Sequence, residues 1–179
     1  HQWGDIRGYC IYGNERDRLY LNTGNKKGHL FIDVSEKIGM TEELNSRGMA
    51  AADFDNDGRM DLLVTNIFSN PTLYKNLVKV KDTWIGFQLE SFDDRCNRQG
   101  VGSRVEISYK NSKGKLKKQM REIQIATGFS AQSDIRAHFG LGDLGKKESI
   151  KLKINWCGIE QRAYSFNKFN SYHKVILKR

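Results

Sequence analysis

Polar and apolar positions alternate along most of the chain. Short runs rich in β-branched and aromatic residues recur between clusters of Gly, Asn and Asp, as expected for half-buried strands. These runs cover residues 18–24, 30–35, 61–68, 83–92, 103–109, 121–128, 149–156 and 173–179. Residues 106–125 have the pattern of a hairpin that turns through Asn111, Ser112 and Gly114. The best helix candidate, residues 35–44, is short and contains a glycine. The pattern therefore predicts an all-β chain.

An internal repeat accompanies this pattern. The segment "DIRGYCIYGNERDRLYLN" at 5–22 parallels "DLLVTNIFSNPTLYKN" at 61–76. A repeat of about 50 residues with a few strands has the size of a β-propeller blade. Only one to one and a half blades fit, so we expect the chain to be the C-terminal end of a longer polypeptide or one chain of a split one. The alternative is a chance similarity between turns rich in Asn and Tyr.

Charge divides the chain into two segments. Residues 1–80 hold 10 basic and 11 acidic side chains, a net of −1, whereas residues 81–179 hold 20 and 10, a net of +10. The basic half admits nucleic acid or an anionic polysaccharide as a partner. A solvated lysine-rich surface is the simpler interpretation, because the lysines of 109–122 gather around a turn without interleaved aromatic residues. No apolar run approaches the roughly 20 residues that span a bilayer.

The three cysteines are far apart in the sequence. Cys10, Cys96 and Cys157 have no CxxC spacing, so zinc and disulfide-framework interpretations are weak. An odd number leaves at least one thiol free or bonded to another chain. The cysteines alone do not decide the redox compartment.

The strongest chemical signal is the loop within "AAADFDNDGRMDLLVTN" at 50–66. Carboxylates at alternate positions of a tight turn can face one point, and the glycine that follows the third permits the bend. The predicted ligands are the side chains of Asp53, Asp55, Asp57 and Asp61 and the backbone carbonyl of Arg59. Coordination entirely by oxygen favours Ca²⁺ over Mg²⁺, and zinc would require His or Cys.

This loop does not fit an EF-hand. The twelfth position of that motif needs a glutamate and a flanking helix, whereas Val64 stands there inside a strand pattern. The loop also offers no base or nucleophile. We therefore expect a structural ion that neutralises the crowded carboxylates. An empty acidic turn and a catalytic metal are the alternatives.

Two other stretches have functional interpretations that we consider weaker. In "GFSAQSD" (128–134), Ser130 or Ser133 could act with Asp134 and His138 as a triad, but the segment is not G-x-S-x-G. A turn in which Ser133 and Asp134 satisfy backbone amides is simpler. "GVGSRVEI" (100–107) leads into a strand, so it offers no helix N-terminus to a phosphate.

The first half resembles a known family. "GMAAADFDNDGRMDLLVTN" (48–66) followed by "LYKN" (73–76) resembles the calcium-binding repeats of the FG-GAP/VCBS type in integrin-like β-propellers. "LYLNTGNKKGHLFIDVSEKIGM" (19–40) resembles the linking stretch of these repeats, with Lys26 and Lys27 as a small insertion.

The second half resembles the ASPIC/UnbV domain, which closes such propellers in secreted bacterial proteins and in the cartilage acidic protein. The matching pieces are "WIGFQL" (84–89), "NRQGVGSRVEI" (97–107), "REI" (121–123), "GFSAQSD" (128–134), "HFGLG" (138–142) and "KINW" (153–156). The family usually has a W-P-S-G turn where this chain has Trp156, Cys157 and Gly158.

These resemblances imply a propeller segment at 1–80 and a small β-sandwich or barrel-like ASPIC/UnbV domain at 81–179. They imply a non-enzymatic, calcium-stabilised binding module outside the cell, in the periplasm or at the cell surface. Its partners would be another protein chain, the remaining propeller or a glycan. An accessory part of a secreted enzyme or redox complex is the alternative, and nucleic-acid binding is the weakest hypothesis. We expect the chain alone to be oligomeric or poorly soluble.

Overall fold

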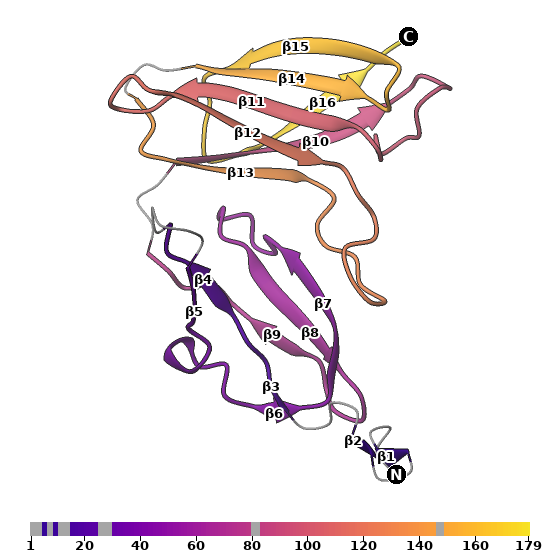
Figure 1. Ribbon diagram of the computed structural model, residues 1–179. Helices are drawn as coiled ribbons and strands as arrows, with labels where there is room; N and C mark the ends of the chain where they lie inside the picture. The colour runs from indigo at the N-terminus through magenta and orange to yellow at the C-terminus, as the bar shows by residue number, and fades with distance from the viewer. Residues whose placement is uncertain (1–4, 7–8, 11–14, 25–29, 80–82, 146–148) are drawn as a thin grey trace. The chain divides into compact units, whose positions relative to one another are not determined.

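The computed structural model (Figure 1) describes residues 5–6, 9–10, 15–24, 30–79, 83–145 and 149–179. Two compact units divide the chain. We call residues 1–49 with 63–73 the repeat unit, and residues 50–62 with 74–179 the sandwich unit. The boundary predicted after residue 80 lies outside the described residues. Within the described residues, no helix has the length and apolar composition needed to cross a membrane.

Short antiparallel strand pairs make up most of the repeat unit. The strands are β1 (Asp5–Ile6), β2 (Tyr9–Cys10), β3 (Glu15–Arg16), β4 (Tyr20–Asn22), β5 (Phe31–Asp33) and β6 (Glu43–Leu44). They pair as β1 with β2, β3 with β6, and β4 with β5. The helix candidate at 35–44 is reduced to the single 3₁₀ turn η1 (Glu36–Ile38), because Gly39 ends it in the left-handed conformation.

A three-stranded sheet with the order β7-β8-β9 follows in the sequence. It consists of β7 (Ser46–Ala52), β8 (Asp61–Asn66) and β9 (Thr72–Tyr74). The acidic loop connects β7 to β8. Val64, which excluded an EF-hand, lies buried in β8. The metal-loop candidate therefore joins two strands of one sheet, as the sequence predicted.

The sandwich unit contains two further sheets around one core. A four-stranded sheet has the order β12-β11-β14-β15, and a three-stranded sheet has the order β13-β10-β16. The strands are β10 (Thr83–Ser91), β11 (Arg104–Lys110), β12 (Leu116–Glu122), β13 (Ala137–Gly142), β14 (Ile150–Trp156), β15 (Glu160–Phe166) and β16 (Tyr172–Leu177). β10 and β16 run parallel, and the other pairs are antiparallel. The all-β prediction is confirmed, and the second half is a sandwich.

The period-2 alternation decides which side chains form the core. Val105 and Ile107 of β11, Phe87 of β10 and Phe139 of β13 are almost fully buried, together with Trp156 of β14. Their polar neighbours in the sequence point the other way. Burying apolar surface contributes about 25 cal/mol per Å². This core is therefore the main source of the sandwich unit's stability.

The three-stranded sheet of the sandwich is buried on both of its faces near one end. Gly86 of β10 pairs with His138 of β13 and with Tyr172 of β16, and Trp84 lies two residues away on the same face. A Cβ at Gly86 would overlap the Tyr172 ring, so this position requires glycine. The opposite face of β10 points into the sandwich core. The face with Trp84, His138 and Tyr172 is left to pack against another segment.

Candidate metal centre

The acidic loop turns tightly because two of its residues adopt positive φ. Asn56 has φ 60° and Gly58 has φ 87°. Asparagine and glycine tolerate this left-handed region better than other residues do. The turn places the carboxylates of Asp53, Asp55 and Asp57 so that one oxygen of each lies within 4.8 Å of the others. The alternating spacing thus brings together three of the predicted ligands.

Asp53 is the buried centre of the loop. Its residue surface is 1% exposed. Oδ1 accepts a hydrogen bond from Asp57 N at 3.0 Å, and Oδ2 accepts one from Gly58 N at 2.9 Å. A third comes from the Tyr172 hydroxyl to Oδ2 at 2.8 Å. A buried carboxylate needs such donors, because leaving it unsatisfied would cost several kcal/mol.

Cationic side chains contact the two outer carboxylates. Lys75 Nζ lies 2.7 Å from Asp55 Oδ2, and the Arg59 guanidinium pairs with Asp57. The hydrogen bond from Lys75 holds the pKa of Asp55 below its ordinary value, and the same contact raises the pKa of Lys75. Both effects show that negative charge at this loop favours cations.

The other two predicted ligands have different surroundings. Asp61 is buried, and its Oδ1 accepts a hydrogen bond from Asn76 N at 2.7 Å. Arg59 donates its backbone N–H to Asp57 Oδ1, and its Nε donates to the carbonyl of Asn76. The cluster within 4.8 Å comprises Asp53, Asp55 and Asp57. Asn76, like Lys75, belongs to the segment "LYKN". This segment thus contributes two residues to the polar contacts of the loop.

The donor set of the cluster fits a calcium ion. Its three carboxylates offer oxygen ligands from a flexible loop, which suits the variable coordination of Ca²⁺. No His or Cys belongs to the cluster of described residues, so its chemistry does not match a zinc site. An ion bound here would supply positive charge that holds the three carboxylates together.

Arg136 and Tyr172 clamp the loop from the sandwich. Arg136 Nη1 donates to Asn56 Oδ1 at 2.6 Å, and Nη2 donates to the Asp53 carbonyl at 3.0 Å. The guanidinium carbon lies 3.7 Å from the centroid of the Tyr172 ring, in cation–π geometry. Burial, reinforced by the hydrogen bond to Asp53, raises the pKa of Tyr172, so its hydroxyl remains a neutral donor.

Trp84 forms the surface against which the turn packs. A Cβ at Gly58 would overlap the Trp84 indole, so glycine is required here by contact as well as by φ. The indole stacks on the His138 ring with centroids 5.4 Å apart. Burial lowers the pKa of His138. The acidic loop thus covers the outer face of β10, β13 and β16 at Trp84, within the sandwich unit.

The residues of the triad hypothesis have other partners. Ser133 Oγ accepts hydrogen bonds from Ala51 N and from the Thr127 hydroxyl. The Asp134 carboxylate pairs with Arg136 at 2.6 Å. Ser130 has φ 46° at the tip of a turn. The Ser133 hydroxyl and the Asp134 carboxylate thus accept hydrogen bonds from backbone amides, as the simpler interpretation predicted.

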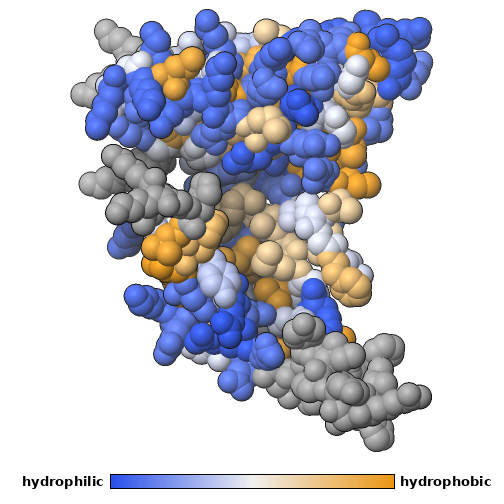
Figure 2. Space-filling view, viewed as in Figure 1, coloured by the Kyte–Doolittle hydropathy of each residue, from blue (hydrophilic) through white to orange (hydrophobic). Residues whose placement is uncertain are grey.

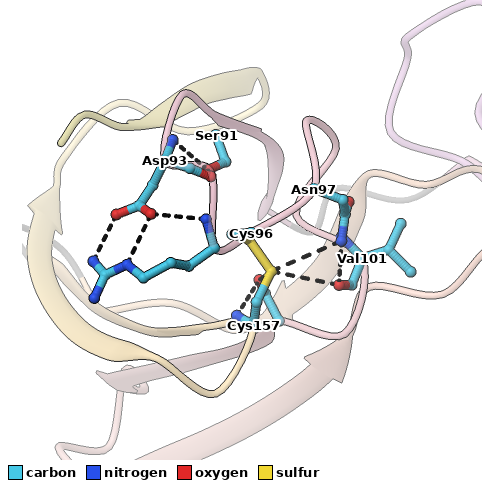
Figure 3. Close-up of a disulfide and its surroundings, with 8 residues drawn as sticks. Ser91, Asp93, Cys96, Asn97, Val101 and Cys157 are labelled. Atoms are coloured by element: carbon cyan, nitrogen blue, oxygen red, sulfur yellow. Dashed lines mark hydrogen bonds and ion pairs between the residues drawn. A yellow bond between two sulfur atoms is a disulfide. The ribbon is translucent and has the colours of Figure 1, made fainter.

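A disulfide joins two of the cysteines (Figure 3). Cys96 and Cys157 are bonded, with their Cα atoms 5.6 Å apart. Cys157 and Gly158 have φ 45° and 78°, and Ile159 N donates to the Trp156 carbonyl. These residues form a tight turn between β14 and β15, with positive φ at two positions. The cysteine spacing had given little weight to a disulfide framework, and for this pair of cysteines that interpretation was wrong. The side chain of Cys10 lies outside the described residues.

The loop that carries Cys96 is itself well ordered by hydrogen bonds. The buried carboxylate of Asp93 accepts two hydrogen bonds from the Arg95 side chain, at 2.9 and 2.7 Å. The same arginine holds the pKa of Asp93 far below its ordinary value. The glycines of "GVGSRVEI" serve this loop: Gly100 and Gly102 have φ 66° and 86° just before β11. They permit turns, as expected.

Sequence reasoning missed the groups that hold the loop. Arg136 is 80 residues from its partner Asn56, and Tyr172 is 119 residues from Asp53. No local pattern connects positions so far apart. One indirect indication of Arg136 was present in the sequence: this residue lies just after "GFSAQSD", a stretch to which no functional role had been assigned.

Comparison with known protein families agrees with this architecture. A family model described as FG-GAP-like repeat matches residues 9–64, and one described as ASPIC and UnbV matches residues 93–177. A search of curated proteins finds no match. The order of the two modules is the one that the motifs indicated. The chain therefore contains an FG-GAP-like repeat followed by an ASPIC and UnbV domain.

Proposed function

We propose that the chain is a non-enzymatic binding module of an extracellular or periplasmic propeller protein, stabilised by a calcium ion in the acidic loop. The observation that carries this proposal is the cluster of Asp53, Asp55 and Asp57, held on the sandwich by Tyr172 and Arg136. The proposed ligands are these three carboxylates with Asp61 and the carbonyl of Arg59. An ion at this position would neutralise the carboxylates of the loop and hold the turn between β7 and β8.

The disulfide supports a location outside the cytosol. Disulfides persist in oxidising compartments and are rare where glutathione keeps thiols reduced. The Cys96–Cys157 bond closes a loop between residues 61 positions apart. FG-GAP repeats are themselves typical of extracellular and cell-surface proteins.

The exposed apolar side chains of the repeat unit support a protein partner. Tyr20 and Leu21 of β4 and Phe31 and Ile32 of β5 are between 40% and 54% exposed. Figure 2 shows apolar side chains at the surface of this unit. Leu21 pairs with Ile32, so these two side chains lie together on one face, and exposed apolar surface of this kind marks protein interfaces. Its proposed occupant is another blade of the same propeller or another protein chain, and light scattering should detect self-association of the isolated chain.

Thermal melting tests the calcium role. Melting curves in chelator, in Ca²⁺ and in Mg²⁺ should differ, with Ca²⁺ stabilising by about 2.7 kcal/mol at a hundredfold excess over its Kd. The variant Asp55→Asn should lose most of this calcium-dependent shift. The matched control Asp94→Asn should retain it, since the Asp94 side chain is 90% exposed and lies outside the loop. Equal melting temperatures in chelator and in Ca²⁺ would contradict the proposal.

A further inference from the structure

The four-stranded sheet of the sandwich has one face outside the core, which we call the basic sheet face. Its side chains alternate with the buried residues of the same strands, such as Val105, Ile107 and Leu152. The register fixes its members. They are Arg104, Glu106, Ser108 and Lys110 of β11; Leu116, Lys118, Met120 and Glu122 of β12; Lys151, Lys153 and Asn155 of β14; and Gln161, Ala163 and Ser165 of β15.

The basic sheet face carries a net positive charge. The face has five basic and two acidic side chains, a net of 5 − 2 = +3. The basic members are Arg104, Lys110, Lys118, Lys151 and Lys153, and none forms an ion pair with another described residue. Six arginines elsewhere in the sandwich unit do form such pairs: Arg59, Arg95, Arg98, Arg136, Arg162 and Arg179. These five unpaired cations lie on one sheet face, although the described part of the sandwich unit has other unpaired cations, such as Lys113, Lys115 and Lys117 of the β11–β12 hairpin.

A shallow hollow of about 410 Å³ lies among these cations. Its lining includes Ser108, which pairs with Lys118 on one side and with Lys151 on the other. Neighbouring strands are about 4.8 Å apart, so the two lysines flank the serine at nearly equal distances. Ala163 also lines the hollow, and its small side chain leaves space there. The lining also includes the Glu106 carboxylate, so an anionic oxygen group would occupy the part of the hollow at Ser108, between Lys118 and Lys151.

We propose that the basic sheet face binds a linear anionic polysaccharide through its sulfate or carboxylate groups. This inference rests on the proposed role as a binding module and names its partner. Charge complementarity is the argument: a flat surface of unpaired lysines around a hydroxyl-bearing hollow suits a chain of regularly spaced anions. The upper part of Figure 2, which holds the sandwich, is mostly hydrophilic.

Nucleic acid fits the same charge less well. No member of the basic sheet face is aromatic, so the face offers no platform on which bases could stack. The β11–β12 hairpin is hydrogen-bonded along β14, so it is not a free two-stranded ribbon that could enter a major groove. The disulfide also indicates a compartment in which polysaccharides are the more abundant polyanions.

The test measures binding of the whole chain to a heparin-derived oligosaccharide by titration calorimetry, at low and at physiological salt. Neutral dextran and duplex DNA serve as comparison ligands. The test variant is Lys118→Gln/Lys151→Gln/Lys153→Gln. The matched control, Lys37→Gln/Lys168→Gln/Lys178→Gln, removes the same charge from exposed positions elsewhere. Circular dichroism checks that both variants fold.

We expect salt-dependent binding of the sulfated probe, no binding of dextran, and an affinity at least about tenfold weaker in the test variant. The control should bind as the unmodified chain does. Absence of binding at low salt, or equal losses in both variants, would overturn the inference. Tighter binding of DNA that disappears in the test variant would overturn it in favour of nucleic acid. Calcium-dependent melting of the same samples shows whether the proposed calcium role fails separately.

Discussion

The hydroxyl of Tyr172 provides a direct test of how the acidic loop is held. It donates to Oδ2 of Asp53, a carboxylate that is 1% exposed and therefore depends on protein donors. The substitution Tyr172→Phe removes this oxygen and leaves the ring in place. The ring would still pack against Trp84, whose centroid is 4.9 Å away, and under the Arg136 guanidinium.

The expected cost follows from the charge and the burial of the acceptor. A hydrogen bond to a charged group contributes about 1.5–3 kcal/mol to stability, so we expect Tyr172→Phe to destabilise the metal-free chain by about 2 kcal/mol. The sandwich unit contains 13 residues of the loop segment and 106 from Tyr74 onward, 119 in all. For a unit of this size, 2 kcal/mol lowers Tm by roughly 8 °C.

Tyr164 supplies the matched control. Its hydroxyl is also buried, but within the described residues it has no hydrogen-bond partner. Tyr164→Phe should therefore leave Tm unchanged or raise it slightly, since it removes an unsatisfied polar atom. Both variants are melted in chelator and followed by near-UV circular dichroism. Equal shifts in the two variants would refute the reasoning, because loss of any tyrosine hydroxyl would then explain the result.

Three further predictions concern the same unit. Gly58→Ala should cost about 3 kcal/mol in denaturant unfolding, whereas Gly114→Ala, with φ 71° and open space around it, should cost only about 1 kcal/mol; similar costs would contradict the contact argument. Reducing the bond between Cys96 and Cys157, 61 residues apart, should lower stability by about 4 kcal/mol, measured with and without reductant. The depressed pKa of Asp93 means that the unfolded chain takes up its proton first, so stability should fall as pH drops below about 4. In the variant Asp93→Asn, the free energy of unfolding should fall less steeply below about pH 4. An unchanged slope would contradict the role assigned to Asp93.

Local patterns were sufficient for several strands and for the acidic loop, whereas β7, β13 and β15 were not among the predicted runs. Alternation of polar and apolar positions marks β11 and β14 because each has one face in the core. The spacing of Asp53, Asp55 and Asp57 marks the cluster because all three lie in one turn. In both cases, the physical cause acts over fewer than ten residues.

Other features depended on partners distant in the sequence. The strand predicted at 121–128 was wrong beyond Glu122: β12 covers Leu116–Glu122, because its partner β11 begins at Arg104 and their pairing ends there. The disulfide was not predicted, because short cysteine spacings such as CxxC do not indicate a bond between cysteines that are far apart in the sequence. A better signal was available: Cys157 replaces the usual turn residues of the family, and such a change invites a search for a second cysteine.

The close fit between Gly58 and Trp84 has an evolutionary consequence. A side chain added at position 58 would overlap the indole, and one added at Gly86 would overlap the ring of Tyr172. In both contacts, a glycine on one segment makes room for an aromatic ring on another. Among relatives, we expect each glycine and its ring to be replaced together, so that the acidic loop and the sandwich are inherited as a matched pair and fail when exchanged singly.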